Sequence, residues 1–282
     1  MSIVVMVDGG GNFSKSSMKK YNIDVLPYNI EFSNGDTYRD LVDVKCQKDL
    51  VELIQKHNDL PKIHALDSEK VATRLRKHIE NGDDVLYITS SSKLTNSYRK
   101  ALEISKDFDP NTIQVIDSLN IGDGQTLLAI AAREYINNGN GLKQTTKYIS
   151  KLRHSIMSCY AIGNSNYLYN KQNCQTMNDN YLEFHNDFPI AELNNGKIVL
   201  TYSTKDLLLG LQILKNRILD QKNNIETSPV IISYSGDKSV AVRLKEYVKK
   251  MLSNDVIVLE HSSVIFVNTG MNTVSLSFIV KR

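Results

Sequence analysis

The sequence lacks several features that mark specialised classes of protein. Its 282 residues include only three cysteines, Cys46, Cys159 and Cys174, which are odd in number and have no close spacing. This pattern disfavours a disulfide framework and a zinc site, so we expect free thiols. No apolar run approaches the roughly 18 residues that cross a bilayer, and residues 1–8 have neither a basic leader nor a cleavage-like site. We therefore expect a cytoplasmic protein without stable membrane insertion.

An excess of one charge is also missing. The chain has 34 Lys and Arg against 31 Asp and Glu, a formal charge of +3, which gives no electrostatic footprint for nucleic acid. No two of its six histidines share a helical spacing that would aim both at one metal. We therefore expect no nucleic acid partner, no metal and no cofactor. The hydrophobic content of 41% is typical of globular proteins, and the length corresponds to about two domains.

Apolar runs alternate with helical patterns in the first half of the chain. Short runs rich in β-branched residues predict strands at 3–7, 85–88 and 113–116. A helix with an N-cap at Asp67-Ser68 is expected to end before Gly82, and further helices are expected at 94–108 and 126–136. The Asn-Gly pair at 34–35 predicts a hairpin turn. This alternation predicts right-handed crossovers and a parallel sheet.

The pattern changes after Gly141. A long helix is expected at 142–157, and the Asn- and Tyr-rich residues 163–187 are expected to be irregular. Strands are then predicted at 197–202, 230–234, 256–259 and 273–280, with helices at 204–221 and 237–252 and a hairpin-like pair around Gly270. We therefore expect an α/β protein of two domains, an N-terminal parallel-sheet domain at 1–152 and a C-terminal mixed α/β domain at 153–282.

Familiar nucleotide-binding and catalytic motifs are missing. Glycines follow the first strand at 9–11, but Ser14 stands where a dinucleotide fingerprint needs its last glycine. There is no Walker-type Gly-Lys-Ser/Thr and no Gly-x-Ser-x-Gly elbow. The hydroxyl-rich segment 89–98 instead leads from the carboxyl end of a strand into a helix, where open α/β sheets bind ligands and helix-start amides suit a carboxylate or phosphate. N-capping alone is the alternative explanation of this segment.

Several segments, in order along the chain, are similar to one family. Segment 91–98, Ser-Ser-Lys-Leu-Thr-Asn-Ser-Tyr, resembles the Ser-Ser-Lys-Leu-Ser-Gly-Thr-Tyr motif of the DegV family. Segments 38–43 and 115–118 match its Tyr-Arg-Asp segment and its Val-Ile-Asp-Ser strand end, and 264–272 resembles its Val-Ile-Gly-Thr-His-Thr-Gly-Pro-Gly pattern. The sequence is identified as a divergent member of this family of bacterial fatty-acid-binding proteins, which includes the FakB carriers.

The resemblance implies a non-catalytic carrier that holds one long-chain fatty acid, such as palmitate. The tail would be buried, and the carboxylate would be bonded near the domain junction. A fatty acid kinase is the partner that the resemblance implies. It also implies that Thr95 supplies a head-group hydroxyl. The predicted lipid-binding residues are His64, Ser92, Thr95, Asn96 and Asn268.

Some of these residues depart from the family pattern. Ile63 and His64 stand in the first head-group segment, expected as a loop at 63–67, where the family has Thr and Ser. Asn96 replaces a glycine, and Asn268 replaces the C-terminal histidine. A protonated imidazole beside a carboxylate forms a favourable pair, so His64 is the predicted substitute for the missing hydroxyl.

We hypothesise that His64 and Thr95 hold the head group and that affinity falls as rising pH removes the imidazole proton. Titrating the affinity for a fatty acid in the parent and in His64→Ala tests this hypothesis, and identical pH profiles would contradict it. Three alternatives remain open from the sequence: a binder of another lipid or small anionic ligand, an enzyme with Ser92 or Thr95 as nucleophile, and an interaction protein with a collapsed pocket. No sequence-identifiable base supports the enzyme.

Overall fold

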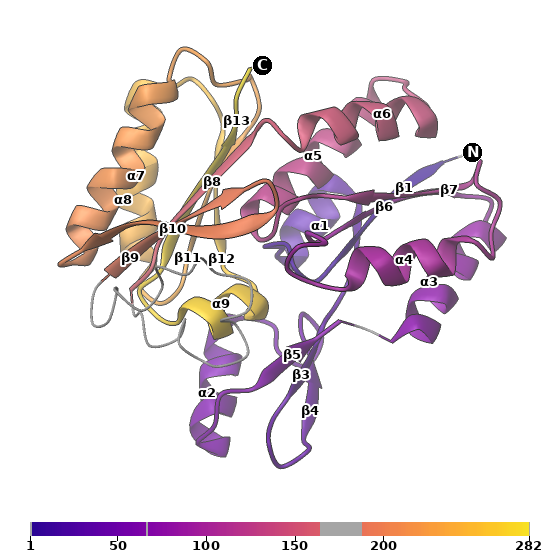
Figure 1. Cartoon of the computed structure of the whole chain (residues 1–282), viewed down its shortest axis with the longest axis horizontal. Helices are drawn as coiled ribbons and strands as arrows, with labels where there is room; N and C mark the ends of the chain where they lie inside the picture. The colour runs from indigo at the N-terminus through magenta and orange to yellow at the C-terminus, as the bar shows by residue number, and fades with distance from the viewer. Residues whose placement is uncertain (1, 66, 164–187, 282) are drawn as a thin grey trace.

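A four-stranded parallel sheet forms the first half of the molecule. The computed structural model describes residues 2–65, 67–163 and 188–281 (Figure 1). The sheet has the order β2-β1-β6-β7, and its strands are β1 (Ile3–Asp8), β2 (Ile23–Leu26), β6 (Asp84–Thr89) and β7 (Ile113–Asp117). Val5 of β1 lies between Ile23 of β2 and Leu86 of β6, both in parallel register. The predicted parallel sheet is therefore confirmed.

Helices cover both faces of this sheet, as alternation along its strands requires. Met6 packs with α3 (Ser68–Glu80) and α4 (Ser97–Ser105), whereas Val5 and Val7 pack with the opposite layer. That layer contains α1 (Lys15–Tyr21), α5 (Asp123–Asn137) and α6 (Leu142–Leu152). The predicted N-cap of α3 is confirmed, because the Asp67 carboxylate accepts a hydrogen bond of 2.9 Å from the Lys70 N–H.

A six-stranded mixed sheet forms the second half. Its order is β10-β9-β8-β13-β11-β12. The strands are β8 (Ile156–Ala161), β9 (Phe188–Asn194), β10 (Lys197–Thr204), β11 (Val230–Tyr234), β12 (Val256–Glu260) and β13 (Val274–Ile279). Only β11 and β12 pair in parallel within this sheet, so the predicted mixed character is confirmed. α7 (Leu207–Gln221) and α8 (Lys238–Met251) cover one face, and α5 lies against the other.

A small antiparallel sheet projects below the two large sheets in Figure 1. It has the order β4-β3-β5 and consists of β3 (Asn29–Glu31), β4 (Thr37–Arg39) and β5 (Lys62–His64). The predicted hairpin turn is confirmed, and Gly35 adopts a φ of +88° there. The small sheet and α2 (Gln47–His57) pack against α9 (Ser263–Thr269), so a late segment of the chain contacts its first quarter.

A group of buried polar side chains, the polar seam, joins the two large sheets. The Asp123 carboxylate at the start of α5 accepts hydrogen bonds from the hydroxyls of Ser233 on β11 and Ser275 on β13, and from the Asn12 amide at 2.7 Å. The His261 ring nitrogens lie 2.9 Å from the Ser235 hydroxyl and 2.8 Å from that of Ser275. The seam consists of Asn12, Asp123, Ser233, Ser235, His261 and Ser275, all of them buried.

Two predictions for the second half of the chain are wrong. The helix expected at 142–157 ends at Leu152, because residues from Ile156 onward pair with β13 as strand β8. No hairpin forms around Gly270, since the apolar run before it is helix α9, and β13 pairs with β8 and β11 instead. A short apolar run does not by itself distinguish a buried helix from a buried strand. Apart from Gly163, the irregular segment predicted at 163–187 lies outside the described residues.

Strands β1 to β7 all precede Leu152, and the six strands of the mixed sheet all begin at or after Ile156. We keep 1–152 and 153–282 as the proposed domain limits. Among the described residues, no helix is both long and apolar enough to span a membrane.

Candidate functional site

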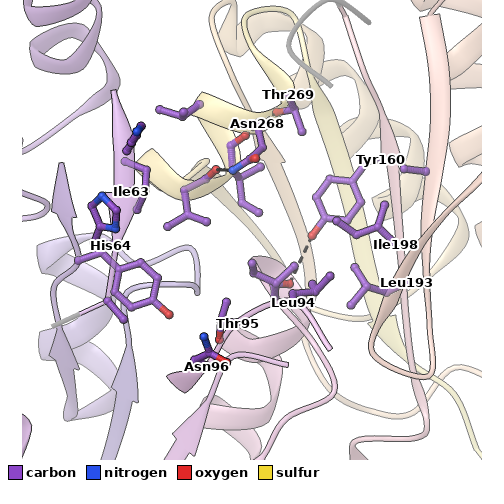
Figure 2. A pocket seen from close by; sticks show the side chains of 18 of the residues that line it. Ile63, His64, Leu94, Thr95, Asn96, Tyr160, Leu193, Ile198, Asn268 and Thr269 are labelled. Carbon is purple, nitrogen blue, oxygen red and sulfur yellow. Dashed lines mark hydrogen bonds between the residues drawn. The ribbon is translucent and has the colours of Figure 1, made fainter. Parts of the chain in front are cut away.

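A pocket of about 440 Å³ lies between the small sheet, the segment before α4, helix α9 and the edge of the mixed sheet (Figure 2). This volume is within the range of small-molecule sites. Most of its lining is apolar: Ile63, Ala65, Leu94, Ile121, Tyr160, Ile162, Ala191, Leu193, Ile198, Val264, Ile265 and Val267. The polar members are Tyr28, Lys62, His64, Thr95, Asn96, Lys100, Glu192, Asn268 and Thr269.

His64 enters the pocket lining from a strand rather than from the expected loop. β5 pairs with β3, which places His64 opposite Asn29 and Lys62 opposite Glu31. The His64 Nε2 atom lies 3.4 Å from a carboxylate oxygen of Glu31, and both side chains are half exposed. The imidazole therefore sits at the edge of the pocket with one acidic neighbour.

Thr95 and Asn96 line the pocket because α4 begins later than the sequence pattern predicts. The expected helix at 94–108 is observed only over Ser97–Ser105, since the chain first turns back on Ser91 through N–H bonds from Leu94 and Thr95. The Thr95 hydroxyl accepts a hydrogen bond of 3.2 Å from the Ser97 N–H, which leaves its own proton available to donate. Asn96 is the N-cap residue but makes no side-chain cap bond.

Asn268 approaches the same pocket from α9, as Figure 2 shows. Its Nδ2 group donates a hydrogen bond of 2.6 Å to the Val264 carbonyl one turn earlier. This bond uses one of the two N–H donors of the amide, and the amide also has an acceptor oxygen.

Ser92 is not among the residues that line the pocket. Its backbone N–H donates to the Asp117 carboxylate at 3.0 Å, and its side chain is exposed. Among the predicted site residues, the structure therefore brings His64, Thr95, Asn96 and Asn268 around one cavity and places Ser92 outside its lining.

A hydrogen-bonded group lies behind the pocket wall. The Tyr28 hydroxyl shares hydrogen bonds with Ser97 at 3.0 Å and with Ser90 at 3.4 Å, and the Ser90 hydroxyl donates to the buried Asp8 carboxylate at 2.6 Å. Burial, with a further contribution from the negative charge of Asp8, raises the pKa of Tyr28 well above its usual value. Tyr28 therefore stays protonated over the physiological range and presents a hydroxyl rather than a phenolate.

Charge is distributed unevenly around the cavity. The basic side chains that line it, Lys62, His64 and Lys100, come from β5 and α4. Among the described lining residues, Glu192 of β9 is the one carboxylate, and Arg217 donates to it at 2.6 and 2.9 Å. In Figure 2, His64 and Thr95 face Tyr160, Leu193 and Ile198 across the cavity. The pocket thus has a basic, hydroxyl-bearing side and a largely apolar side.

Sequence reasoning missed five polar members of the lining: Tyr28, Lys62, Lys100, Glu192 and Thr269. Tyr28 follows Pro27 directly after strand β2, and nothing local marks its side chain as functional. Lys100 carries a usable signal, because it lies four residues after Asn96 and residues at that spacing share a helix face.

Comparison with known proteins identifies the fold and the family. The family model described as uncharacterised protein, DegV family, matches residues 2–281. The chain belongs to the DegV family. One DegV domain-containing relative, from Clostridium perfringens, is 29% identical over 159 residues, which span 56% of this chain and 56% of that protein.

Solved DegV structures share the whole architecture. A DegV lipid-binding protein from Thermotoga maritima has a TM-score of 0.85 at 21% identity, covering 99% of each chain. A stearic-acid-binding protein from Eubacterium ventriosum has a TM-score of 0.85 at 22% identity, covering all of this chain and 99% of the other. At such identities the likeness shows the fold, a parallel N-terminal sheet with a mixed C-terminal sheet.

Proposed function

We propose that this DegV protein binds one long-chain fatty acid in the pocket and acts as a non-catalytic, cytoplasmic lipid carrier. The observation that carries the proposal is the two-sided lining of the cavity. Apolar side chains from the mixed sheet and α9 suit an acyl tail, whereas His64, Thr95 and Asn96 offer hydrogen-bond donors to a carboxylate.

Magnitudes support a ligand with a long tail. Burying about 14 methylene groups of a palmitate-like chain contributes roughly 11 kcal/mol before costs, at about 0.8 kcal/mol for each. Association costs about 4–15 kcal/mol, and one hydrogen bond to a charged group returns only about 1.5–3 kcal/mol. The tail therefore provides most of the affinity, and the polar side fixes orientation.

The ligands of structural relatives support the same ligand class. The Thermotoga protein is described as lipid-binding and the Eubacterium protein as binding stearic acid. The resemblance of segments 91–98 and 264–272 to the DegV family, which includes the FakB carriers, supports delivery of the bound acid to a fatty acid kinase. Fatty-acid-dependent phosphate transfer by such a kinase, with and without this protein, tests that step.

Native mass spectrometry of the freshly purified protein, followed by organic extraction, tests the binding step. We expect one fatty acid per chain, released on extraction and replaced by added palmitate. A bound fatty acid also raises the unfolding temperature by mass action. An empty protein that shows no thermal shift with added fatty acids would contradict the proposal, and a different extracted anion would identify another ligand class.

A further inference from the structure

Lys100 occupies a distinctive place in the pocket lining. It lies in the first turn of α4, where its N–H donates to the Asn96 carbonyl at 3.1 Å. Its side chain is partly buried and lines the main pocket together with Thr95 and Asn96. It also borders a cavity of about 10 Å³ behind the wall, beside Tyr28 and Ser97. The ammonium therefore belongs to the same side of the pocket as the hydroxyl groups.

The other basic residues of the lining have an acidic neighbour. His64 lies 3.4 Å from the Glu31 carboxylate, and Lys62 is exposed and opposite Glu31 in the β3–β5 pairing. Lys100, by contrast, makes no ion pair within 4.0 Å among the residues that the structure describes. A partly desolvated ammonium without a partner gains most from an anionic ligand.

One acidic residue, Asp8, borders the same small cavity as Lys100. Its carboxylate is already occupied by donors from three other residues. The Ser90 N–H and hydroxyl donate at 2.9 and 2.6 Å, the Gln125 amide at 2.9 Å and the Gly10 N–H at 3.2 Å. The hydrogen bonds of Asp8 are thus made within the fold, and no ion pair joins it to Lys100 among the described residues.

We infer that Lys100 is the counter-charge that makes this pocket select an ionised fatty acid over a neutral lipid of the same length. The inference rests on the proposed function and adds a specificity residue to it. The uneven charge of the lining gives the same direction, because its basic side chains, Lys62, His64 and Lys100, lie on the side of the hydroxyl groups.

Affinities for palmitate and for hexadecanol, measured in parallel, test the inference. The parent is expected to bind palmitate about tenfold more tightly than hexadecanol, as one bond to a charged group contributes about that factor. Lys100→Met is expected to lose this preference by weakening palmitate about tenfold while leaving hexadecanol unchanged. Lys100→Arg should retain the preference. Lys106→Met, an exposed lysine at the end of the same helix, is the matched control.

The outcomes separate the inference from the proposed function. A parent that binds neither lipid contradicts the proposed function and with it the inference. Two results would overturn the inference alone. One is tight palmitate binding with no preference over hexadecanol. The other is a preference that survives in Lys100→Met but disappears in Lys62→Met. Circular dichroism of each variant establishes folding, and Lys100→Gln provides a second neutral substitution with a polar side chain.

Discussion

The polar seam and the pocket use similar residue types for different ends. In the seam, hydroxyl, amide and imidazole groups bond to one another, and Asp123 accepts from three partners. In the pocket, the polar groups keep unused bonding capacity. Thr95 still has a hydroxyl proton to donate, Asn96 makes no side-chain cap bond, and Lys100 makes no ion pair among the described residues. Saturated polar groups specify how the sheets meet, whereas groups with spare bonding capacity can receive a ligand. Substitutions in the seam should therefore change stability, and substitutions in the pocket should change affinity.

The largest effect is expected from Asp123→Ala. Removing this carboxylate leaves three buried donors unpartnered, so the free energy of unfolding should fall by about 3–5 kcal/mol. Urea denaturation measures the loss, and the folded fraction should keep its affinity for palmitate. Asp220→Ala, an exposed position on α7, is the control and should change stability by less than about 0.5 kcal/mol. An Asp123→Ala variant that loses affinity for palmitate but keeps its stability would contradict this separation of roles.

The next effect concerns the apolar side of the pocket. Ile198→Asp places a charge where the acyl tail is proposed to lie, so palmitate affinity should fall about 100-fold. Because Ile198 is only partly buried, the unfolding temperature should change little. Leu208→Asp, at a side chain that is 72% exposed on α7, provides the same chemical change outside the pocket. Equal affinities in the two variants would show that the tail lies elsewhere.

A smaller effect, per pH unit, is expected from the buried histidine of the polar seam. Burial lowers the pKa of His261 to about 3 from its ordinary value of 6.5. Between these values the unfolded chain binds a proton that the folded protein does not, so stability falls as pH drops from about 6.5 towards 3. The contribution is up to about 1.4 kcal/mol per pH unit. Urea unfolding at several pH values should show a shallower slope for His261→Gln, and parallel slopes would exclude this role.

The smallest effect is expected at the head group. Thr95→Val removes one donor to the proposed carboxylate, and palmitate affinity should fall about tenfold with little change in stability. Thr95→Ser should restore most of the affinity. Thr73→Val, on the exposed face of α3, serves as control. Unchanged binding in Thr95→Val would mean that other residues of the lining hold the head group.

The sequence predicts the parallel strands more reliably than the helices beside the pocket. β1, β6 and β7 are short, mostly apolar runs rich in β-branched residues, and their parallel pairing follows from the helices between them. The start of α4 and the helical state of α9 are not predictable in this way. At α4 the backbone turns on Ser91, and at α9 an apolar run fits both states until Phe266 and Val267 pack on the small sheet.

The same limits apply to the pocket. The family resemblance leads to four residues that line one cavity, because a motif fixes local neighbours on short segments. It does not reveal that Ser92 lies outside the lining or that Lys100 joins Thr95 in it. Those facts depend on where the helix begins and on how the β5 strand packs across from it, which are tertiary properties.

The position of α9 also constrains the order of events in the cell. The pocket walls come from residues between Tyr28 and Thr269, so the cavity is incomplete until synthesis has passed α9. A nascent chain that stops short of α9 lacks part of the wall of the proposed lipid site. Loading of the proposed ligand is therefore expected only after α9 has been synthesised.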